Sequence, residues 1–426
     1  MPETRASGPG RNRLRLASAQ RKLRAFLDQV EALEASDFPH GDAEDALATI
    51  KKKFLERRRQ IERILPGSPA VDTECESLIR AVTKYTSTLG LILRSTNVRN
   101  HFEIYYPLRV LVEKLVPGTK LILSSEWDLF PFTFPVGHMD EFIFIGSPAT
   151  EADDILIVPL AAHEIGHSVW NRHNIARKLD RYLSKAVVKH LQSQLPGMSE
   201  EFDTPPASRR GPGKPSRPQE TEAGAVQDAY DLAWEQAQEV FCDLIALYTF
   251  DDGYIYAHEH IMAPGGLYRD ESYPDSQARV EYIRKGAEFW SVKYDPRAIA
   301  GWKPSEANEQ DWALDVADAA VRDVVPQLIR ITDRLMGRVG IPRNDPVVVA
   351  QIRRCFQARI PYEKLALLSE IVSAGWQVLR NEGGLGAGAD KKRHDSLQEV
   401  MLKSMELSEF SRRLEDAERR KNTGAS

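Results

Sequence analysis

The sequence predicts an α+β protein that is mainly α, in which a small sheet leads directly into a helix carrying two histidines. Apolar residues recur every three or four positions near both ends of the chain, as they do along one face of a helix. Between residues 119 and 145, short runs rich in β-branched and aromatic residues alternate with turn residues. The sequence HEIGH follows at 163–167. We therefore expect N- and C-terminal helical regions on either side of a mixed central domain.

The composition limits the classes of protein that need to be considered. A chain of 426 residues exceeds one ordinary core, since a domain takes about 150 residues. A net charge of −5 gives no general attraction to nucleic acid or anionic membranes. The three cysteines lie far apart, which excludes a disulfide scaffold and favours a reducing compartment. No apolar run approaches the ~20 residues of a membrane helix. We expect a cytoplasmic protein without a membrane segment.

The N-terminal part is predicted to be helical after a short disordered segment. Residues 1–12 contain few apolar residues, and we expect them to be disordered. Helical periodicity extends from Leu14 to Leu65 and again from Glu74 to Ser95, which defines a helical N-terminal region at 13–100. The basic run KKKFLERRR at 51–59 has no aromatic or motif context, so it is interpreted as a solvated helix face.

The central domain is predicted at residues 101–295. Strands are expected at about 119–125, 130–135 and 141–145, and the helix with HEIGH follows them. Residues 196–225 are rich in Pro, Gly, Ser and charge, which predicts a flexible insertion. Helical periodicity resumes from Tyr230 to Phe250.

The C-terminal region, residues 296–426, is predicted to be helical. Helices are expected at 312–337, 347–357, 361–381 and 394–421, with EGGLGAGADKK between the last two.

HEIGH places two histidines and a glutamate where they can form a metal site. Residues four apart lie on one face of a helix, so His163 and His167 can present two imidazoles to one ion, with Glu164 beside them. Zn²⁺ suits this set because it accepts neutral nitrogen and carboxylate ligands and leaves one position for water. The metal would lower the pKa of that water, and Glu164 would take its proton.

One candidate for the third ligand is His173, six residues after His167. This is the metzincin spacing, and the sequence HIMAP at 260–264 offers a Met-turn. However, Trp170 stands where that motif has a glycine, and a bulky side chain resists the sharp turn that would bring His173 back. We expect His173 to be a polar residue near a helix end.

The other candidate lies on the helix at 233–250. Glu235, Glu239 and Asp243 follow one another at four-residue steps, while the remaining faces of this helix are largely apolar. Buried carboxylates are costly unless they bind a metal or are paired. Glu239 can serve as a ligand, and Asp243 can accept the free N–H of a ligating histidine.

HEIGH followed by EVFCDLIAL resembles the signature of gluzincin-type zinc metallopeptidases, and YPDSQARVEYI at 273–283 is similar to a segment found after the third ligand in several such families. The resemblance covers about residues 140–285 and implies a zincin-like catalytic domain. It implies that His163, His167 and Glu239 bind zinc and that Glu164 is the base. It also implies that Asp243 orients a histidine and that Arg279 pairs with a buried carboxylate.

An oxyanion-stabilising group is expected among the Tyr and His residues after this helix. The candidates are Tyr254, Tyr256, His258, His260, Tyr268 and Tyr273. Tyr273 and His260 are preferred. Cys242 is interpreted as a small core residue, because no neighbour in the sequence would activate it.

The sequence thus predicts a zinc-dependent metallopeptidase that acts on a peptide or protein substrate. An alternative is an inactive, zinc-stabilised scaffold that binds protein partners through its helical arms. A nucleic-acid-associated protein using the basic N-terminal segment is a third hypothesis, disfavoured by the acidic pI near 6.1. It predicts binding that weakens steeply with salt.

Overall fold

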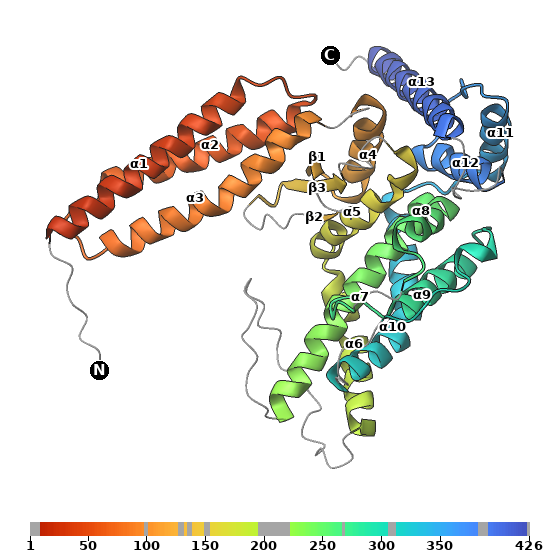
Figure 1. Cartoon of the computed structure of the whole chain (residues 1–426), viewed down its shortest axis with the longest axis horizontal. Helices are drawn as coiled ribbons and strands as arrows, with labels where there is room; N and C mark the ends of the chain where they lie inside the picture. Colours follow the sequence, from red (N-terminus) through yellow and green to blue (C-terminus); the bar gives the residue numbers. More distant parts are fainter. Residues whose placement is uncertain are drawn as a thin grey trace. The chain divides into compact units, whose positions relative to one another are not determined.

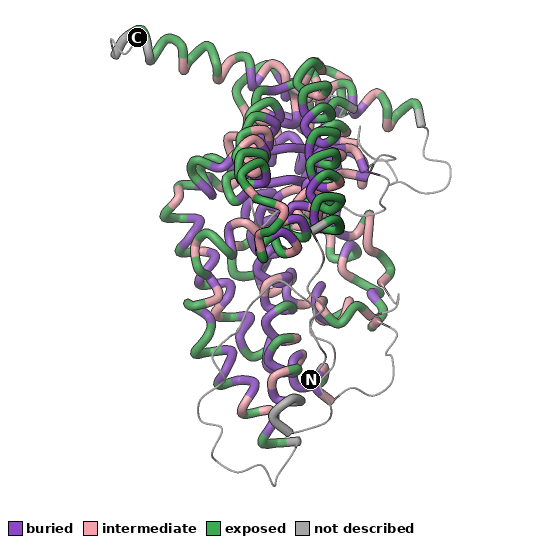
Figure 2. Tube along the Cα trace, turned by 90° about the vertical axis from the view of Figure 1, so that its left-hand side faces the viewer, coloured by how far each residue is buried: buried purple, intermediate pink, exposed green. Residues whose placement is uncertain are grey.

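The computed structural model describes residues 9–97, 101–126, 132–133, 139–148, 154–194, 222–265, 269–305, 312–381 and 391–423. These residues form many helices and one small sheet (Figure 1), which confirms the α+β, mainly α class. Within them, no helix combines the length and apolar character needed to cross a bilayer. Most helices carry both buried and exposed positions, as amphipathic sequences require (Figure 2).

The chain forms two compact units. The first comprises residues 1–101 and 119–153, and the second comprises residues 102–118 and 154–426. This division groups the strands with the N-terminal helices. The boundaries predicted from the sequence (1–12, 13–100, 101–295 and 296–426) assign the strands to the domain of the HEIGH helix instead, and they stay a prediction.

The first unit contains three long helices and the sheet. The helices are α1 (Pro9–Glu34), α2 (Gly41–Glu62) and α3 (Val71–Arg94), followed by the 3₁₀ turn η1 (Ser95–Asn97). The sheet order is β1-β3-β2, with β1 (Lys120–Glu126) parallel to β3 (Phe142–Pro148) and the short β2 (Phe132–Thr133) antiparallel to β3. All three strands lie at the predicted positions. The residues on either side of β2, 127–131 and 134–138, lie outside the described part of the chain.

Aromatic rings form the centre of this unit's core. The ring centroids of Phe26 on α1 and Phe54 on α2 are 4.2 Å apart, and Tyr85 on α3 meets Phe54 edge-on at 5.1 Å.

The expected disorder of residues 1–12 is wrong for residues 9–12, because α1 begins at Pro9 and these residues are helical. Asn12 is 8% exposed, and its amide donates to the carbonyl oxygen of Pro66 at 3.1 Å. This long-range contact is not visible in the local composition.

The second unit is a helical assembly around one buried helix, α7 (Glu222–Phe250). Every residue of α7 from 239 to 250 is buried. Helices α5, α6, α8, α9, α10 and α12 all pack against it. The other elements are α4 (His101–Leu115), η2 (Ile155–Ile157), α5 (Pro159–Arg172), α6 (Ile175–Gln194), α8 (Asp252–Met262), α9 (Ser276–Phe289), η4 (Pro296–Ala298), α10 (Trp312–Val339), α11 (Pro346–Gln357), α12 (Leu368–Asn381) and α13 (Lys391–Thr423).

Two predicted boundaries in this unit are wrong. The helix expected from 361 begins only at Leu368, because the backbone N–H groups of Tyr362 and Ala366 donate to the hydroxyls of Ser404 and Ser408 on α13. The insertion expected at 196–225 is helical from Glu222 onward. Its other residues, up to 221, lie outside the described part of the chain.

Candidate metal centre

Helices α5 and α7 approach each other very closely at Gly166. A Cβ atom built on Gly166 would lie 2.8 Å from the Cα of Cys242, a distance that real Cβ atoms essentially never show. Only a glycine therefore permits this backbone approach. The close contact therefore holds this part of α5 against α7, including His163, three residues before Gly166, and His167, directly after it.

The three predicted metal ligands converge at this contact. Nε2 of His163 lies 3.1 Å from one carboxylate oxygen of Glu239, and Nε2 of His167 lies 3.6 Å from the other. Donor atoms around tetrahedral zinc are about 3.4 Å apart, given metal–ligand bonds of about 2.0–2.2 Å. Both spacings are close to this value, so the two nitrogens and the carboxylate fit a zinc ion.

Cys242 offers a fourth donor at the same place. Its sulfur and the ring nitrogens of His163 and His167 all lie within 4.8 Å of one another. The thiol is fully buried on α7. Burial raises the pKa of Cys242 well above its usual value, and the nearby charges of Glu239 and Glu164 raise it further. Without a metal this thiol is therefore protonated, but a bound cation deprotonates a coordinating thiol, so Cys242 is an alternative third donor to Glu239. The interpretation of Cys242 as a core residue stays a prediction.

Asp243 collects hydrogen bonds from three helices. It accepts from Nδ1 of His163 at 2.8 Å and from the hydroxyl of Tyr254 at 2.5 Å. The guanidinium of Arg279 on α9 donates to both of its oxygens, each at 2.7 Å. The carboxylate is 2% exposed, and these bonds compensate for its loss of water. Asp243 thus fixes Nδ1 of His163 as a donor, which leaves Nε2 directed at Glu239.

The two histidines differ in their electrostatics. Burial opposes protonation of His163, but the hydrogen bonds to Asp243 and Glu239 outweigh it and raise its pKa to about 10. Burial lowers the pKa of His167 to about 4, against a weaker opposite effect of Glu239. Without a metal, His163 therefore carries a positive charge and donates hydrogen bonds to Asp243 and Glu239, while His167 stays neutral. Two positive imidazoles at this spacing would repel each other.

Gln238 lies at the candidate metal centre, a placement that the sequence did not reveal. The amide nitrogen Nε2 of Gln238 lies 3.1 Å from Nδ1 of His167, the nitrogen that faces away from Glu239, so in this orientation the amide donates to Nδ1. If the amide is rotated so that its oxygen takes this position, it accepts from Nδ1–H and leaves Nε2 of His167 free to bind a metal, the role that Asp243 has for His163. The one feature of the sequence that could have identified Gln238 is that it directly precedes Glu239 on α7.

Glu164 and Tyr273 lie at the same site. Glu164 is 7% exposed and precedes the Gly166 contact on α5, while Tyr273 is 36% exposed. The guanidinium of Arg279 stands 5.1 Å from the centre of the Tyr273 ring. Burial raises the pKa of Tyr273 far above its usual value, and the charges of Glu239 and Glu164 raise it further. The phenol therefore stays protonated beside two carboxylates and can act as a hydrogen-bond donor.

The structure does not bring His260 to this site. His260 is exposed near the end of α8, and its ring lies 5.8 Å from that of Trp376. Tyr254, on the same helix, reaches Asp243, and His258 stacks on Trp302 at 5.1 Å. His260 is half a turn beyond His258 and therefore points to the opposite side of α8.

Other candidates from the sequence have different partners. Tyr256 accepts a hydrogen bond from the backbone N–H of Asp295 at 2.9 Å. Glu235 is exposed and accepts a hydrogen bond from Ser272 at 2.9 Å. Tyr268 lies outside the described residues. None of these observations places a further ligand at the metal centre.

His173 also has a different partner. Helix α5 ends at Arg172, and the chain turns at Asn174 with φ of 49°. Nε2 of His173 lies 2.7 Å from the carbonyl oxygen of Leu115, while Trp170 is buried between Trp234 and Phe241. The metzincin motif has its turning glycine at the position of Trp170, whereas here the chain turns four residues later, at Asn174. His173 is therefore directed to the end of α4.

Comparison with known proteins identified no relative of this chain. No protein-family model, curated protein or solved structure matches this chain.

Proposed function

We propose that this chain is a zinc-dependent metallopeptidase of the gluzincin type. The observation that supports this most strongly is the convergence of His163, His167 and Glu239 at spacings of 3.1 and 3.6 Å between donor atoms. Glu164 stands next to the first of these ligands in the chain and is not one of the donors. A glutamate in this position is what water activation beside zinc requires.

Zinc, when bound, lowers the pKa of water and polarises a carbonyl group. The protein residues perform the proton transfers and hold the geometry. Glu164 takes the proton of the attacking water and then delivers it to the leaving amine. Asp243 holds His163 in the orientation and tautomer that directs its Nε2 at the metal position. Gln238 lies against Nδ1 of His167 and would do the same for that imidazole with its amide oxygen turned toward Nδ1.

Tyr273 is the preferred group for stabilising the oxyanion of the reaction. Its hydroxyl is protonated, and its ring is held by Arg279, which is in turn fixed by Asp243. A positioned donor of this kind stabilises negative charge that develops on the substrate carbonyl oxygen. Tyr273 is 36% exposed, and the side chain of His167 is 22% exposed. Substrate therefore reaches the site on the side of these two residues.

The substrate class follows from the resemblance to gluzincins. Hydrolysis of a peptide bond in a peptide or protein, in the cytoplasm, is the activity that we propose. The same residues held around zinc without turnover would form a structural centre, with the helical arms available to protein partners. Glu164 separates these two functions because a structural zinc site needs no base.

The test compares Glu164→Gln with wild type after both are loaded with zinc. Wild type is first screened against denatured proteins and a peptide library to obtain a substrate. Glu164→Gln should retain zinc and the fold but lose about 10²–10⁴-fold in turnover, the usual value of a general base. Glu235→Gln removes an exposed carboxylate and serves as the control, with unchanged turnover. Equal cleavage by Glu164→Gln excludes this mechanism, and a zinc-loaded wild type that cleaves nothing favours the structural centre.

A further inference from the structure

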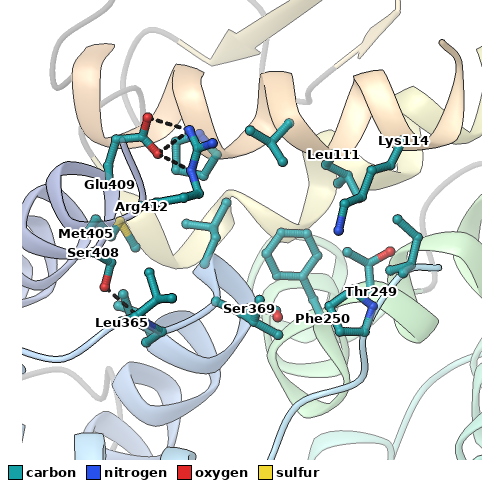
Figure 3. A pocket seen from close by; sticks show the side chains of 18 residues that line it. Leu111, Lys114, Thr249, Phe250, Leu365, Ser369, Met405, Ser408, Glu409 and Arg412 are labelled. Carbon is teal, nitrogen blue, oxygen red and sulfur yellow. Dashed lines mark hydrogen bonds and ion pairs between the residues drawn. The ribbon is translucent and has the colours of Figure 1, made fainter. Parts of the chain in front are cut away.

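The second unit contains an apolar cavity that is separate from the metal centre. Its volume is about 140 Å³. Figure 3 shows the side chains that line it. It is lined by one side of α4, the end of α7, the start of α12, part of α13 and the loops at 341–342 and 365–367. Phe250, Ile371 and Met405 form its buried walls, and each is 1% exposed. A cavity of roughly 150 Å³ lined by such residues accepts a benzene ring, so an aryl group fits this one.

The polar side chains in the cavity wall are almost all satisfied within the protein. Glu409 is 3% exposed and accepts hydrogen bonds from Arg412 and Arg413. The Ser408 hydroxyl donates to the carbonyl oxygen of Lys364, and the Thr249 hydroxyl donates to that of Ile245. These groups have few hydrogen-bonding positions left for a ligand. A ligand must therefore be recognised through apolar contacts with the cavity wall and through an unpaired charge at the rim.

Lys114 supplies that charge. It lies at the end of α4 and has no hydrogen-bond or ion-pair partner among the residues that the structure describes. The neighbouring acid Glu113 pairs with Arg109 at 3.0 Å. Figure 3 shows the ammonium group of Lys114 turned toward Phe250, whereas Arg412 is turned to Glu409. The rim thus carries one ammonium group available to an anion, directly above an apolar, ring-sized space.

We propose that this cavity binds a small arylalkanoate, a monocarboxylate with one aromatic ring. The ring fills the space between Phe250, Ile371 and Met405, and the carboxylate pairs with Lys114. Such a site needs neither zinc nor the chemistry of the metal centre. The cavity floor is the C-terminal end of α7, so its occupant contacts the same helix that carries Glu239 and Asp243.

The experiment uses the full chain labelled with ¹³C at its methionine methyl groups. 3-Phenylpropionate is titrated, and the neutral 3-phenylpropanol is the matched ligand with the same ring and chain. Met405 lines the cavity, and its signal is assigned with Met405→Leu. Met336 is buried on α10 outside the cavity and serves as the internal control. The ring current of the acid should shift Met405 and leave Met336 unchanged.

The charge is tested with Lys114→Met. Wild type should bind the acid several times more tightly than the alcohol, about three- to fivefold for a partly exposed ion pair. Lys114→Met should bind both alike, whereas Lys403→Met, an exposed lysine on α13 that pairs with Glu406, should behave as wild type. Ala366→Phe and, independently, Val110→Trp should block both ligands in protein that melts as wild type. Absence of a Met405 shift, equal binding of acid and alcohol by wild type, or full selectivity in Lys114→Met would overturn the proposal.

Discussion

A Cβ atom added to Gly166 would lie 2.8 Å from the Cα of Cys242, so α5 and α7 meet almost backbone to backbone. This contact lies between the two candidate histidine ligands on one helix and between Glu239 and Asp243 on the other. The donor spacings of the metal centre therefore depend on a glycine that carries no functional group.

We predict that Gly166→Ala weakens zinc binding and destabilises the protein. The added methyl group must push α5 away from α7, and overpacking of this kind costs about 1–3 kcal/mol. The control is Gly337→Ala in α10, where an added Cβ meets nothing within 4 Å and helix propensity predicts a gain of about 0.5–1 kcal/mol. Urea unfolding and zinc competition with a chelator measure both effects. Wild-type zinc affinity in Gly166→Ala would show that the approach is not needed.

Asp243→Asn should reduce both stability and zinc affinity. The change leaves Arg279 buried without its charge partner, which costs about 3–5 kcal/mol, and it weakens the acceptor of His163. Loss of an outer partner of a ligating histidine typically lowers metal affinity about 10- to 100-fold. Asp323→Asn breaks a more exposed pair with Lys189 and should cost less than about 1 kcal/mol. Similar melting temperatures for the two variants would contradict this view of Asp243.

Gln238→Met should weaken zinc binding about 10- to 100-fold without unfolding the protein. Methionine has a similar size but cannot hydrogen-bond to Nδ1 of His167, whereas Gln238→Glu supplies an acceptor for Nδ1–H and should retain most of the affinity. Gln227→Met is the matched control, because Gln227 lies on the same helix and forms an exposed hydrogen bond with Asp231. Zinc affinity is measured by chelator competition. An unchanged affinity in Gln238→Met would remove Gln238 from the metal centre.

The stability of the protein should depend on the ionisation of Asp252. Asp252 is 4% exposed. Burial raises the pKa of its carboxyl group to about 6, although a hydrogen bond from Gln377 acts in the opposite direction. The unfolded chain releases this proton near pH 4, so folding becomes less favourable as the pH rises from about 4 to about 6. Asp252→Asn cannot ionise.

At about pH 7 the Asp252→Asn variant should be more stable than wild type by roughly 3 kcal/mol, since two pKa units correspond to about 2.7 kcal/mol. The difference should disappear near pH 4, where both proteins are neutral at this position. Urea unfolding over this pH range measures it, with the exposed Asp315→Asn as control. A difference that grows toward low pH would have the wrong sign.

Much of the fold and of the candidate site could be predicted because the signals are local. Residues four apart share a helix face whatever surrounds them, so the pairs His163/His167 and Glu239/Asp243 follow from the sequence alone. Apolar periodicity likewise predicts α3 and α10 within a few residues of their observed ends.

The remaining features depend on contacts between distant residues. Gln238 meets His167 across 71 positions of the chain, and no local pattern encodes that distance. Residues 361–367 have a proline where a helix can begin, yet hydroxyl groups on α13 capture their backbone N–H groups. Tyr273 and His260 were equal candidates by residue type. Only the packing of α8 against α12 directs His260 to Trp376.

The central claim is that His163, His167 and Glu239 bind zinc, and elemental analysis of dialysed protein tests it most directly. Wild type and His173→Ala should each retain about one zinc per chain, because His173 is held by Leu115 and not by the metal centre. Glu239→Ala and His163→Ala should lose it while remaining folded. Full zinc occupancy in Glu239→Ala together with loss in His173→Ala, or a wild type that binds no zinc, would contradict the account.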